Sequence, residues 1–228
     1  MLEKYQRLIP IYEEQGLMKL QRRHVLIVGL GGVGGFVVES LARTGIKSID
    51  ICDGDIIELS NFNRQIIAID SNINVLKTEA FKKRIQEIDN EIKVNTYPFF
   101  IKENNIDEIS FDNYDLVIDC IDDVEAKITL IKKCKEFNVE IISCMGTGNK
   151  SNPQKFKICD INQTYQCPLA KKVRTELKKL DIKNVKVCFS DEIPMKNEQR
   201  IIASQIFVVG SAGLLIASEA IKYLIALK

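Results

Sequence analysis

Apolar residues in the first two thirds of the chain form short runs that alternate with segments of helical periodicity. The runs are rich in valine and isoleucine and cover residues 24–30, 48–53, 116–121 and 139–144, with a further strand-like stretch at 92–99. Between them, apolar side chains recur every three or four positions in residues 34–44, 74–88 and 124–137. Strands that alternate with helices at this spacing predict βαβ units around a parallel sheet.

The pattern changes after Gly148. Residues 156–160 and 185–189 are predicted strands, with a helix over 169–180 between them and a polar, proline-containing loop over 190–204. The apolar run 206–227 contains glycine, serine and charged residues, and its charge-free stretch is short for a membrane span, so we expect a buried or interface helix. At the other end of the chain, residues 2–20 predict an amphipathic helical arm.

Together these elements predict an α/β fold. We expect a Rossmann-like, mostly parallel sheet with helices on both faces, extended by a C-terminal part with additional, partly antiparallel strands and a terminal interface helix. The length fits one domain over residues 1–228. Within it we expect a helical arm (1–22), a nucleotide-binding half (23–148) and a half for substrate binding and dimer contact (149–228).

Charge is balanced overall but not along the chain. The sequence has 32 Lys and Arg against 31 Asp and Glu, which by itself implies no polyanionic partner. Residues 1–149, however, carry 18 basic against 24 acidic residues, whereas residues 150–200 carry 12 against 6. The second segment could therefore form a basic face for an anionic partner, although a well-solvated helix explains the charge equally well.

The seven cysteines are odd in number, and no two have the spacing CxxC. This pattern excludes a disulfide framework and lacks the paired ligands of a structural zinc site, so we expect no zinc. The N-terminal ten residues are charged and contain no continuous apolar core, so we expect no signal peptide. A reduced, cytoplasmic protein is the simplest interpretation.

Four glycines, Gly29, Gly31, Gly32 and Gly34, lie between the first predicted strand and its helix. Glycines at such a turn let the backbone approach a phosphate, whose charge is favoured at a helix N-terminus. About 20 residues later, Asp53 ends the second strand and suits a ribose hydroxyl. A dinucleotide enzyme and an ATP enzyme are equally consistent with these features.

The residues that follow favour ATP. Asp55, Asn61 and Arg64 come directly after Asp53, and Lys77 begins the next helix, so cations are available to neutralise a triphosphate. Asp122, just beyond the strand at 116–121, is placed to hold Mg²⁺ at the carboxyl edge of the sheet. Each has an ordinary alternative: a turn residue for Asn61, surface charges for Arg64 and Lys77, a helix N-cap for Asp122.

In this order the motifs GxGGxG, DxDxxxxSNxxRQ and DxxDxxxxK resemble the ThiF/MoeB/HesA superfamily of ubiquitin-activating-type adenylating enzymes. The resemblance implies ATP contacts from Gly31, Asp53, Asn61, Arg64 and Lys77, with Asp122 on magnesium. It also implies a homodimer in which the arm, here Lys4-Tyr5-Gln6-Arg7, supplies Arg7 to the partner's site. Arg7, Arg64, Lys77 and Asp122 are then the candidate catalytic residues. Lys4 and Lys127 stand where this family more often has arginine, so the bidentate fork is lost there.

The second half is similar to the tRNA threonylcarbamoyladenosine dehydratase subgroup. The stretches that carry the resemblance are residues 145–161, 167–179 and 187–194, and Asn152 stands where an aspartate is usual. The resemblance implies that ATP adenylates the carboxylate of the threonylcarbamoyl group, after which an internal nucleophile displaces AMP and water is lost overall. The single histidine, His24, starts the first strand, and we expect it to be structural.

The basic segment is then a candidate tRNA-binding surface. Its cations are Lys171, Lys172, Arg174, Lys178 and Lys179, which would contact phosphates without reading sequence. Cys167 precedes this helix, where a nucleophilic or sulfur-relay role, with a sulfur-transfer partner, is the alternative to a buried thiol. Two other functions remain open: an adenylating activator of a ubiquitin-like or sulfur-carrier protein, and an NAD-binding Rossmann protein.

Overall fold

A computed structural model describes residues 3–196, 198 and 201–227. Its sheet has the strand order β3-β2-β1-β4-β5-β7-β6 and is parallel except for β6, which pairs antiparallel with β7. The strands are β1 (His24–Val28), β2 (Ser48–Cys52), β3 (Thr96–Tyr97), β4 (Leu116–Asp119), β5 (Ile141–Cys144), β6 (Phe156–Asp160) and β7 (Lys186–Ser190). The predicted Rossmann-like sheet with a partly antiparallel extension is thus confirmed.

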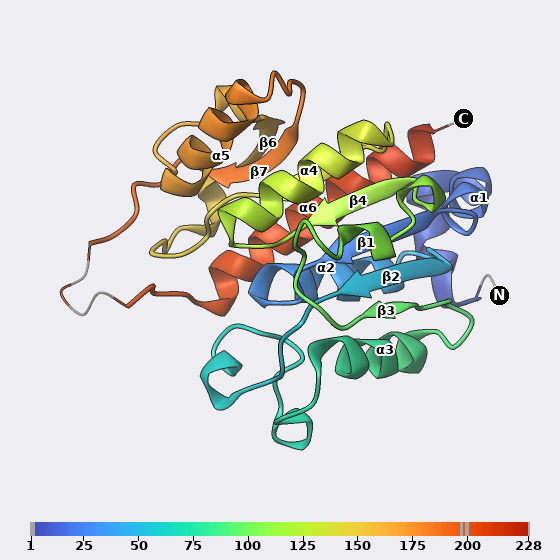
Figure 1. Cartoon of the computed structure of the whole chain (residues 1–228). Coiled ribbons are helices and arrows are strands. Elements are labelled where there is room, and N and C mark those ends of the chain that lie inside the picture. Colours follow the sequence, from blue (N-terminus) through green and yellow to red (C-terminus); the bar gives the residue numbers. More distant parts are fainter. Residues whose placement is uncertain (1–2, 197, 199–200, 228) are drawn as a thin grey trace.

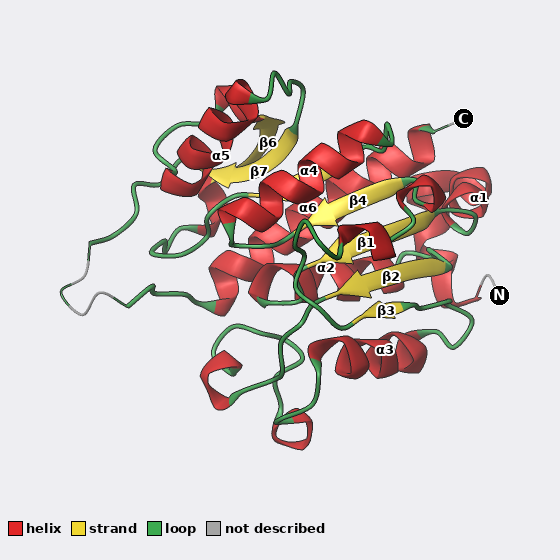
Figure 2. Ribbon diagram, in the orientation of Figure 1, coloured by secondary structure: helices red, strands yellow, loops and turns green. Residues whose placement is uncertain are grey.

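Helices cover both faces of this sheet (Figure 2). They are α1 (Ile9–Leu20), α2 (Gly32–Ala42), α3 (Lys77–Ile88), α4 (Val124–Glu136), α5 (Pro168–Lys179) and α6 (Ile206–Ala226). Alternate strand residues point to opposite faces, so Val25 and Ile27 join the core under α2 and α6, whereas Leu26 and Val28 join the core under α4 and α5. Burial on both faces explains why the strands are apolar at nearly every position.

Two element boundaries differ from the sequence prediction. Helix α3 begins at Lys77 rather than at residue 74, because Asn74 has a φ of +65°. Its N–H donates to the Ile57 carbonyl, and the Ile57 N–H donates to the Val75 carbonyl. The strand expected over 92–99 is only two residues long, although Lys93 and Asn95 still accept backbone hydrogen bonds from β2. Strand β3 lies at the edge of the sheet, where pairing comes from one side only.

Helix α6 is long and apolar enough to cross a membrane by length and composition, but 56% of its most apolar window is buried within this fold. It packs closely against α2, where a side chain on Gly213 would meet the Val33 carbonyl oxygen at 2.6 Å. The prediction of a buried C-terminal helix is therefore confirmed. Its exposed apolar residues include Phe207 and Leu214, near its N-terminus and middle.

The N-terminal arm packs at the edge where the parallel strands begin. A 3-10 turn over Glu3–Leu8 leads into α1, and the Tyr5 hydroxyl donates to Asp89 just beyond α3 at 2.6 Å. The Lys19 ammonium donates to the Ile225 carbonyl at the end of α6 at 2.8 Å. In Figure 1 the arrowheads of β2 and β4 point away from the arm, towards the opposite edge of the sheet.

Candidate functional site

A cavity of about 1620 Å³ lies at the carboxyl edge of the sheet. Its walls include the segments after β1 and β4, the two strands between which the chain order reverses, and this is where ligands bind in open α/β sheets. One half is lined by Gly29, Gly31, Gly32, Asp53, Asp55, Asn61, Arg64, Lys77 and Asp122. The other half is lined by residues 144–150, 167–169 and 201–204.

The glycine loop is shaped by backbone constraints rather than by mobility. Gly29 has a φ of +89°, and a side chain on Gly34 would lie 1.8 Å from the Gly29 carbonyl oxygen, so neither position accepts a Cβ. At Gly31, the N-cap of α2, a Cβ would meet nothing within 4 Å. The space next to Gly31 at the N-terminus of α2 is thus open for a phosphate.

Asp53 fixes the loop to the end of β2. Its two carboxylate oxygens accept the backbone N–H groups of Leu30 at 2.6 Å and Asp55 at 2.9 Å. A carboxylate oxygen has a second lone pair, so the predicted ribose contact is compatible with these bonds. Asp53 therefore has a structural role that the sequence did not reveal.

Asp55 and Lys77 form an ion pair at the cavity wall. The Lys77 ammonium, in a residue only 4% exposed, donates to the Asp55 carboxylate at 2.6 Å. Lys77 is thus not the surface charge of the alternative interpretation, because it is buried and lines the cavity. Its charge is held in place at the start of α3.

Asn61 and Arg64 lie on the segment that crosses from β2 to α3. Asn61 is 5% exposed, and its Oδ1 accepts the Glu58 N–H at 3.1 Å. Arg64 donates through Nη1 to the Ser60 carbonyl at 2.7 Å and to Asn63 Oδ1 at 3.0 Å. Asn61 thus does shape a turn, and both side chains also line the cavity.

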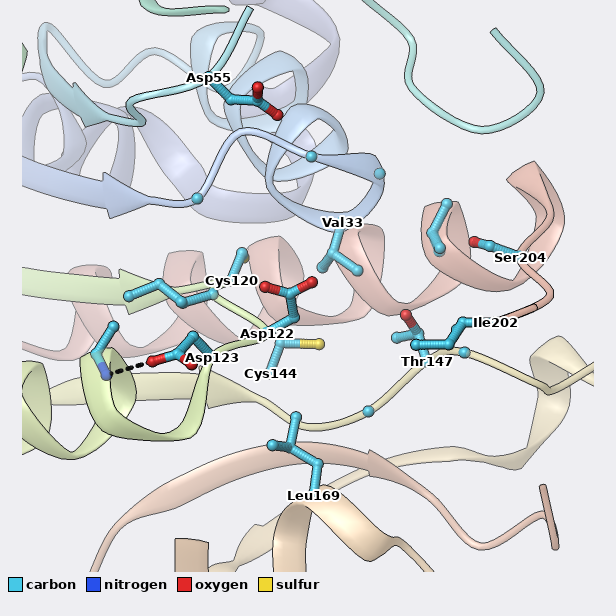
Figure 3. Close-up of a pocket in the computed structure, with 18 of the residues that line it drawn as sticks. Val33, Asp55, Cys120, Asp122, Asp123, Cys144, Thr147, Leu169, Ile202 and Ser204 are labelled. Carbon is cyan, nitrogen blue, oxygen red and sulfur yellow. Dashed lines mark hydrogen bonds between the residues drawn. The ribbon is translucent and has the colours of Figure 1, made fainter. Parts of the chain in front are cut away.

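Asp122 is exposed and points into the cavity between Val33 and Cys144 (Figure 3). The helix N-cap is its neighbour Asp123, whose carboxylate accepts the Ala126 N–H at 2.8 Å. The described residues contain no cluster of three side chains that could enclose a metal. Mg²⁺ commonly takes one or two carboxylates together with phosphate oxygens and water, so Asp122 alone fits such an ion.

A fully buried ion pair lies next to the turn that contains Asp122, between β4 and α4. The Lys127 ammonium donates to Asp119 Oδ2 at 2.8 Å, and both side chains are 0% exposed. Ser143 donates its hydroxyl to the same oxygen, and the Ile121 N–H binds the other oxygen at 2.9 Å. Lys127 therefore holds the turn between β4 and α4 rather than facing the cavity.

The second half of the cavity contains a buried lysine that sequence reasoning missed. Lys150 is 2% exposed and lines the cavity in the loop after β5. Nothing in a Gly-Asn-Lys-Ser sequence distinguishes this residue from an exposed loop lysine, because its surroundings include residues distant in the sequence, such as Ser190. Cys167 is 3% exposed and lines the same half, so its predicted alternative roles stay predictions.

Of the other cysteines, Cys120 and Cys159 are half-buried and the rest are buried, and Cys52, Cys120 and Cys144 line the cavity. Burial raises the pKa of the Cys52 and Cys134 thiols far above the usual value. His24 lies away from the cavity wall, with Nε2 3.1 Å from Asp50 and its ring 4.6 Å from that of Tyr114. Its position agrees with the structural role expected for it.

Four of the five predicted tRNA-contacting cations are exposed on α5, namely Lys171, Lys172, Lys178 and Lys179. Arg174 differs, because its guanidinium donates to the Thr164 carbonyl at 2.8 Å and to the Thr164 hydroxyl, which ties α5 to the preceding turn. Arg7 is exposed on the arm and does not line the cavity of its own chain, which opens at the opposite edge of the sheet.

Residues 4–228 match the ThiF family. The tRNA threonylcarbamoyladenosine dehydratase of Bacillus subtilis is 38% identical over 196 residues, which cover 86% of this chain and 77% of that protein. The crystal structure of the E. coli tRNA N6-threonylcarbamoyladenosine dehydratase in complex with ATP has a TM-score of 0.93 and 30% identity, over 99% of this chain and 95% of that one. A molybdopterin-synthase adenylyltransferase of Haemophilus influenzae is 30% identical over 207 residues, 91% of this chain and 76% of that protein.

Proposed function

Because this chain belongs to the ThiF family, we propose that it uses ATP to dehydrate threonylcarbamoyladenosine in tRNA. The observation that carries the proposal is the two-part cavity, in which the candidate nucleotide-binding residues line one half and residues 144–150, 167–169 and 201–204 line the other. The similarity to dehydratases of Bacillus subtilis and E. coli supports tRNA as the substrate.

In the first step the substrate carboxylate attacks the α-phosphorus of ATP, and pyrophosphate leaves. Charge builds up on the phosphate oxygens, and Arg64 and Lys77 are placed to neutralise it from the nucleotide half of the cavity. The Lys77 ammonium is already paired with Asp55, so it enters the reaction in a fixed position rather than from solution. We assign both residues, and Arg7 of a second copy, to this step.

Magnesium, when bound, would neutralise phosphate charge, and Asp122 is the residue that would hold it. The neighbouring Lys127–Asp119 pair keeps the turn that presents Asp122 in a single position. We assign Asp53 to the ribose of ATP and Asn61 to a further contact with the nucleotide.

In the second step an internal nucleophile of the acyl side chain attacks the activated carbonyl carbon, and AMP leaves. One carboxylate oxygen departs on AMP and one proton leaves the nucleophile, so that, counted from the carboxylic acid form, the nucleoside loses the elements of water. This step needs a good leaving group and a site that excludes bulk water more than it needs a strong base. The cavity wall, with its carboxylates, cations and thiols and no histidine among its residues, agrees with that requirement.

We assign tRNA binding to the exposed lysines of α5, the helix whose first residues, with Cys167, line the second half of the cavity. Phosphate contacts of this kind make the affinity fall steeply as salt is raised. We also propose a cytoplasmic homodimer, in which each arm supplies Arg7 to the other copy's cavity.

The competing function is activation of a carrier protein, which is supported by the similarity to the molybdopterin-synthase adenylyltransferase. Both activities predict exchange of labelled pyrophosphate into ATP, so the test is which substrate stimulates it. We expect tRNA bearing threonylcarbamoyladenosine to stimulate exchange, and unmodified tRNA to have no effect. Stimulation by a Gly-Gly-ended carrier protein and not by the modified tRNA would overturn the proposal.

A further inference from the structure

Lys150 carries an ammonium group into the interior beside the second half of the cavity, in the loop after β5. The residue is 2% exposed, and it lines the cavity together with Cys144 and Cys167. Burial lowers the pKa of Lys150, an effect that nearby Cys167 and Glu192 only partly oppose. A buried cation of this kind is costly unless its hydrogen-bonding capacity is used.

That capacity is largely unused within the chain. Among the described residues, the Lys150 ammonium donates one hydrogen bond, to the Ser190 carbonyl at 2.8 Å, and has no carboxylate within 4 Å. An ammonium has three N–H donors and no acceptor. The nearby carboxylate of Glu192 is itself occupied, because it accepts the N–H groups of Ser151 and Asn152 at 2.9 Å each.

The loop that bears Lys150 is held in shape by other contacts. Asn149 and Ala203 exchange two hydrogen bonds, at 2.7 and 2.8 Å, and the Met195 N–H donates to the Asn149 carbonyl at 2.7 Å. On the other side, Glu192 binds the two residues that follow Lys150. The fold of this loop therefore does not depend on a charge at position 150.

We propose that Lys150 binds the carboxylate of the threonylcarbamoyl group and holds it for attack on ATP, an inference that rests on the proposed function. The carboxylate must approach the α-phosphate near Gly31, so the acyl side chain that bears it occupies the half of the cavity that Lys150 lines. Two N–H donors from one buried ammonium suit an anionic oxygen, and charge-assisted hydrogen bonds are stronger in a site with little water.

The test compares anticodon stem–loop RNAs that carry threonylcarbamoyladenosine or its methyl ester, which lacks the negative charge. Their dissociation constants are measured on the full-length protein, with a non-hydrolysable ATP analogue present, for the wild type and for Lys150→Gln. Glutamine keeps a donor for the Ser190 carbonyl but removes the charge. The matched control is Lys155→Gln, at an exposed lysine of the neighbouring turn.

We expect the wild type and Lys155→Gln to prefer the acid over the ester by at least about tenfold, and Lys150→Gln to lose most of that preference while its affinity for the ATP analogue changes less than about twofold. An unchanged preference in Lys150→Gln overturns the role of Lys150. If the wild type fails to convert the modified tRNA at all, the proposed function fails, which is a separate outcome. A Lys150→Gln protein with lower thermal stability but full preference for the acid would show a structural role and overturn the inference.

Discussion

At the scale of single residues, Gly31 is a position where a substitution should affect nucleotide binding without affecting folding. Its φ is −75°, and a Cβ there would meet no protein atom within 4 Å. We expect Gly31→Ala to leave the free energy of unfolding nearly unchanged but to weaken ATP binding at least about tenfold, because the methyl group takes the space of a phosphate. Isothermal titration with ATP and urea unfolding measure the two quantities.

Gly34→Ala is the control for that experiment, since its Cβ would lie 1.8 Å from the Gly29 carbonyl oxygen. This variant should lose folding stability together with ATP binding. Wild-type ATP affinity in a folded Gly31→Ala protein would mean that the phosphates do not lie against this part of the loop.

Lys127 stabilises the turn between β4 and α4 through its buried ion pair with Asp119. Lys127→Met removes the partner of Asp119, which is 0% exposed, and leaves a buried carboxylate without its cation. We expect a loss of about 3–5 kcal/mol in the free energy of unfolding, measured with urea. Lys132→Met, on the same helix but 47% exposed, should change stability by less than about 0.5 kcal/mol. Equal effects in the two variants would contradict this account of the ion pair.

The candidate nucleotide residues could be predicted to lie along one wall because their motifs follow strands whose ends are easy to locate. Asp53 and Asp122 come directly after apolar runs, and the carboxyl ends of β2 and β4 lie at one edge of the sheet. Lys150 and the Asp119–Lys127–Ser143 contacts could not be predicted in this way. Their geometry depends on neighbouring strands and on a distant loop, which leave no local pattern.

At the scale of elements, the first turn of the arm contacts one buried carboxylate, that of Asp89. Burial by itself would raise the pKa of Asp89, but hydrogen bonds from Lys47, Tyr5 and Lys4 outweigh it and hold that pKa well below its usual value. A group whose pKa is lower in the folded state stabilises the fold above its unfolded pKa of about 4 and loses that contribution as the pH falls towards the folded pKa. The arm should therefore loosen in acid below about pH 4.

Asp89→Asn tests this attachment. We expect the variant to be less stable than the wild type at pH 7, with the difference shrinking as the pH falls below about 4, because the wild-type carboxylate is then protonated in the unfolded chain and must lose that proton on folding. Urea unfolding at several pH values measures the difference, and hydrogen exchange of the amides in Glu3–Leu8 shows whether the arm is the part affected. A difference that is the same at pH 7 and pH 3 would contradict the electrostatic explanation.

The sequence predicted which helices and strands exist more accurately than it predicted where they begin and end. The helix at α3 starts three residues late because Asn74 adopts a left-handed conformation and pairs with Ile57, a contact across a long turn. Strand β3 is also shorter than predicted, whereas β6, at the other edge of the sheet, has the predicted bounds. Apolar patterns therefore predicted the existence of both edge strands but the length of only one.

At the scale of the whole molecule, the position of Arg7 makes a specific prediction about assembly. The arm lies at the edge where the strands begin, whereas the cavity opens at their carboxyl ends, so Arg7 is assigned to a partner's site. We expect Arg7→Ala and Lys77→Ala each to be inactive alone. Mixing them with subunit exchange should restore about a quarter of wild-type activity, because half of the dimers then contain one intact site.

A mixture of Lys77→Ala with Arg64→Ala is the control for this experiment, since both residues belong to the same cavity. In that mixture every dimer has a lesion in each site, and activity should stay absent. Full activity in Arg7→Ala alone would remove the arm from the mechanism.

The central claim concerns the nucleoside that the enzyme produces. The most direct measurement incubates the full chain with ATP, Mg²⁺ and tRNA bearing threonylcarbamoyladenosine labelled with ¹⁸O in its carboxylate, followed by mass spectrometry of the nucleosides and of AMP. The account predicts that threonylcarbamoyladenosine loses one water in an ATP-dependent way and that the label appears in AMP. An unchanged nucleoside, from folded protein that binds ATP, would contradict it.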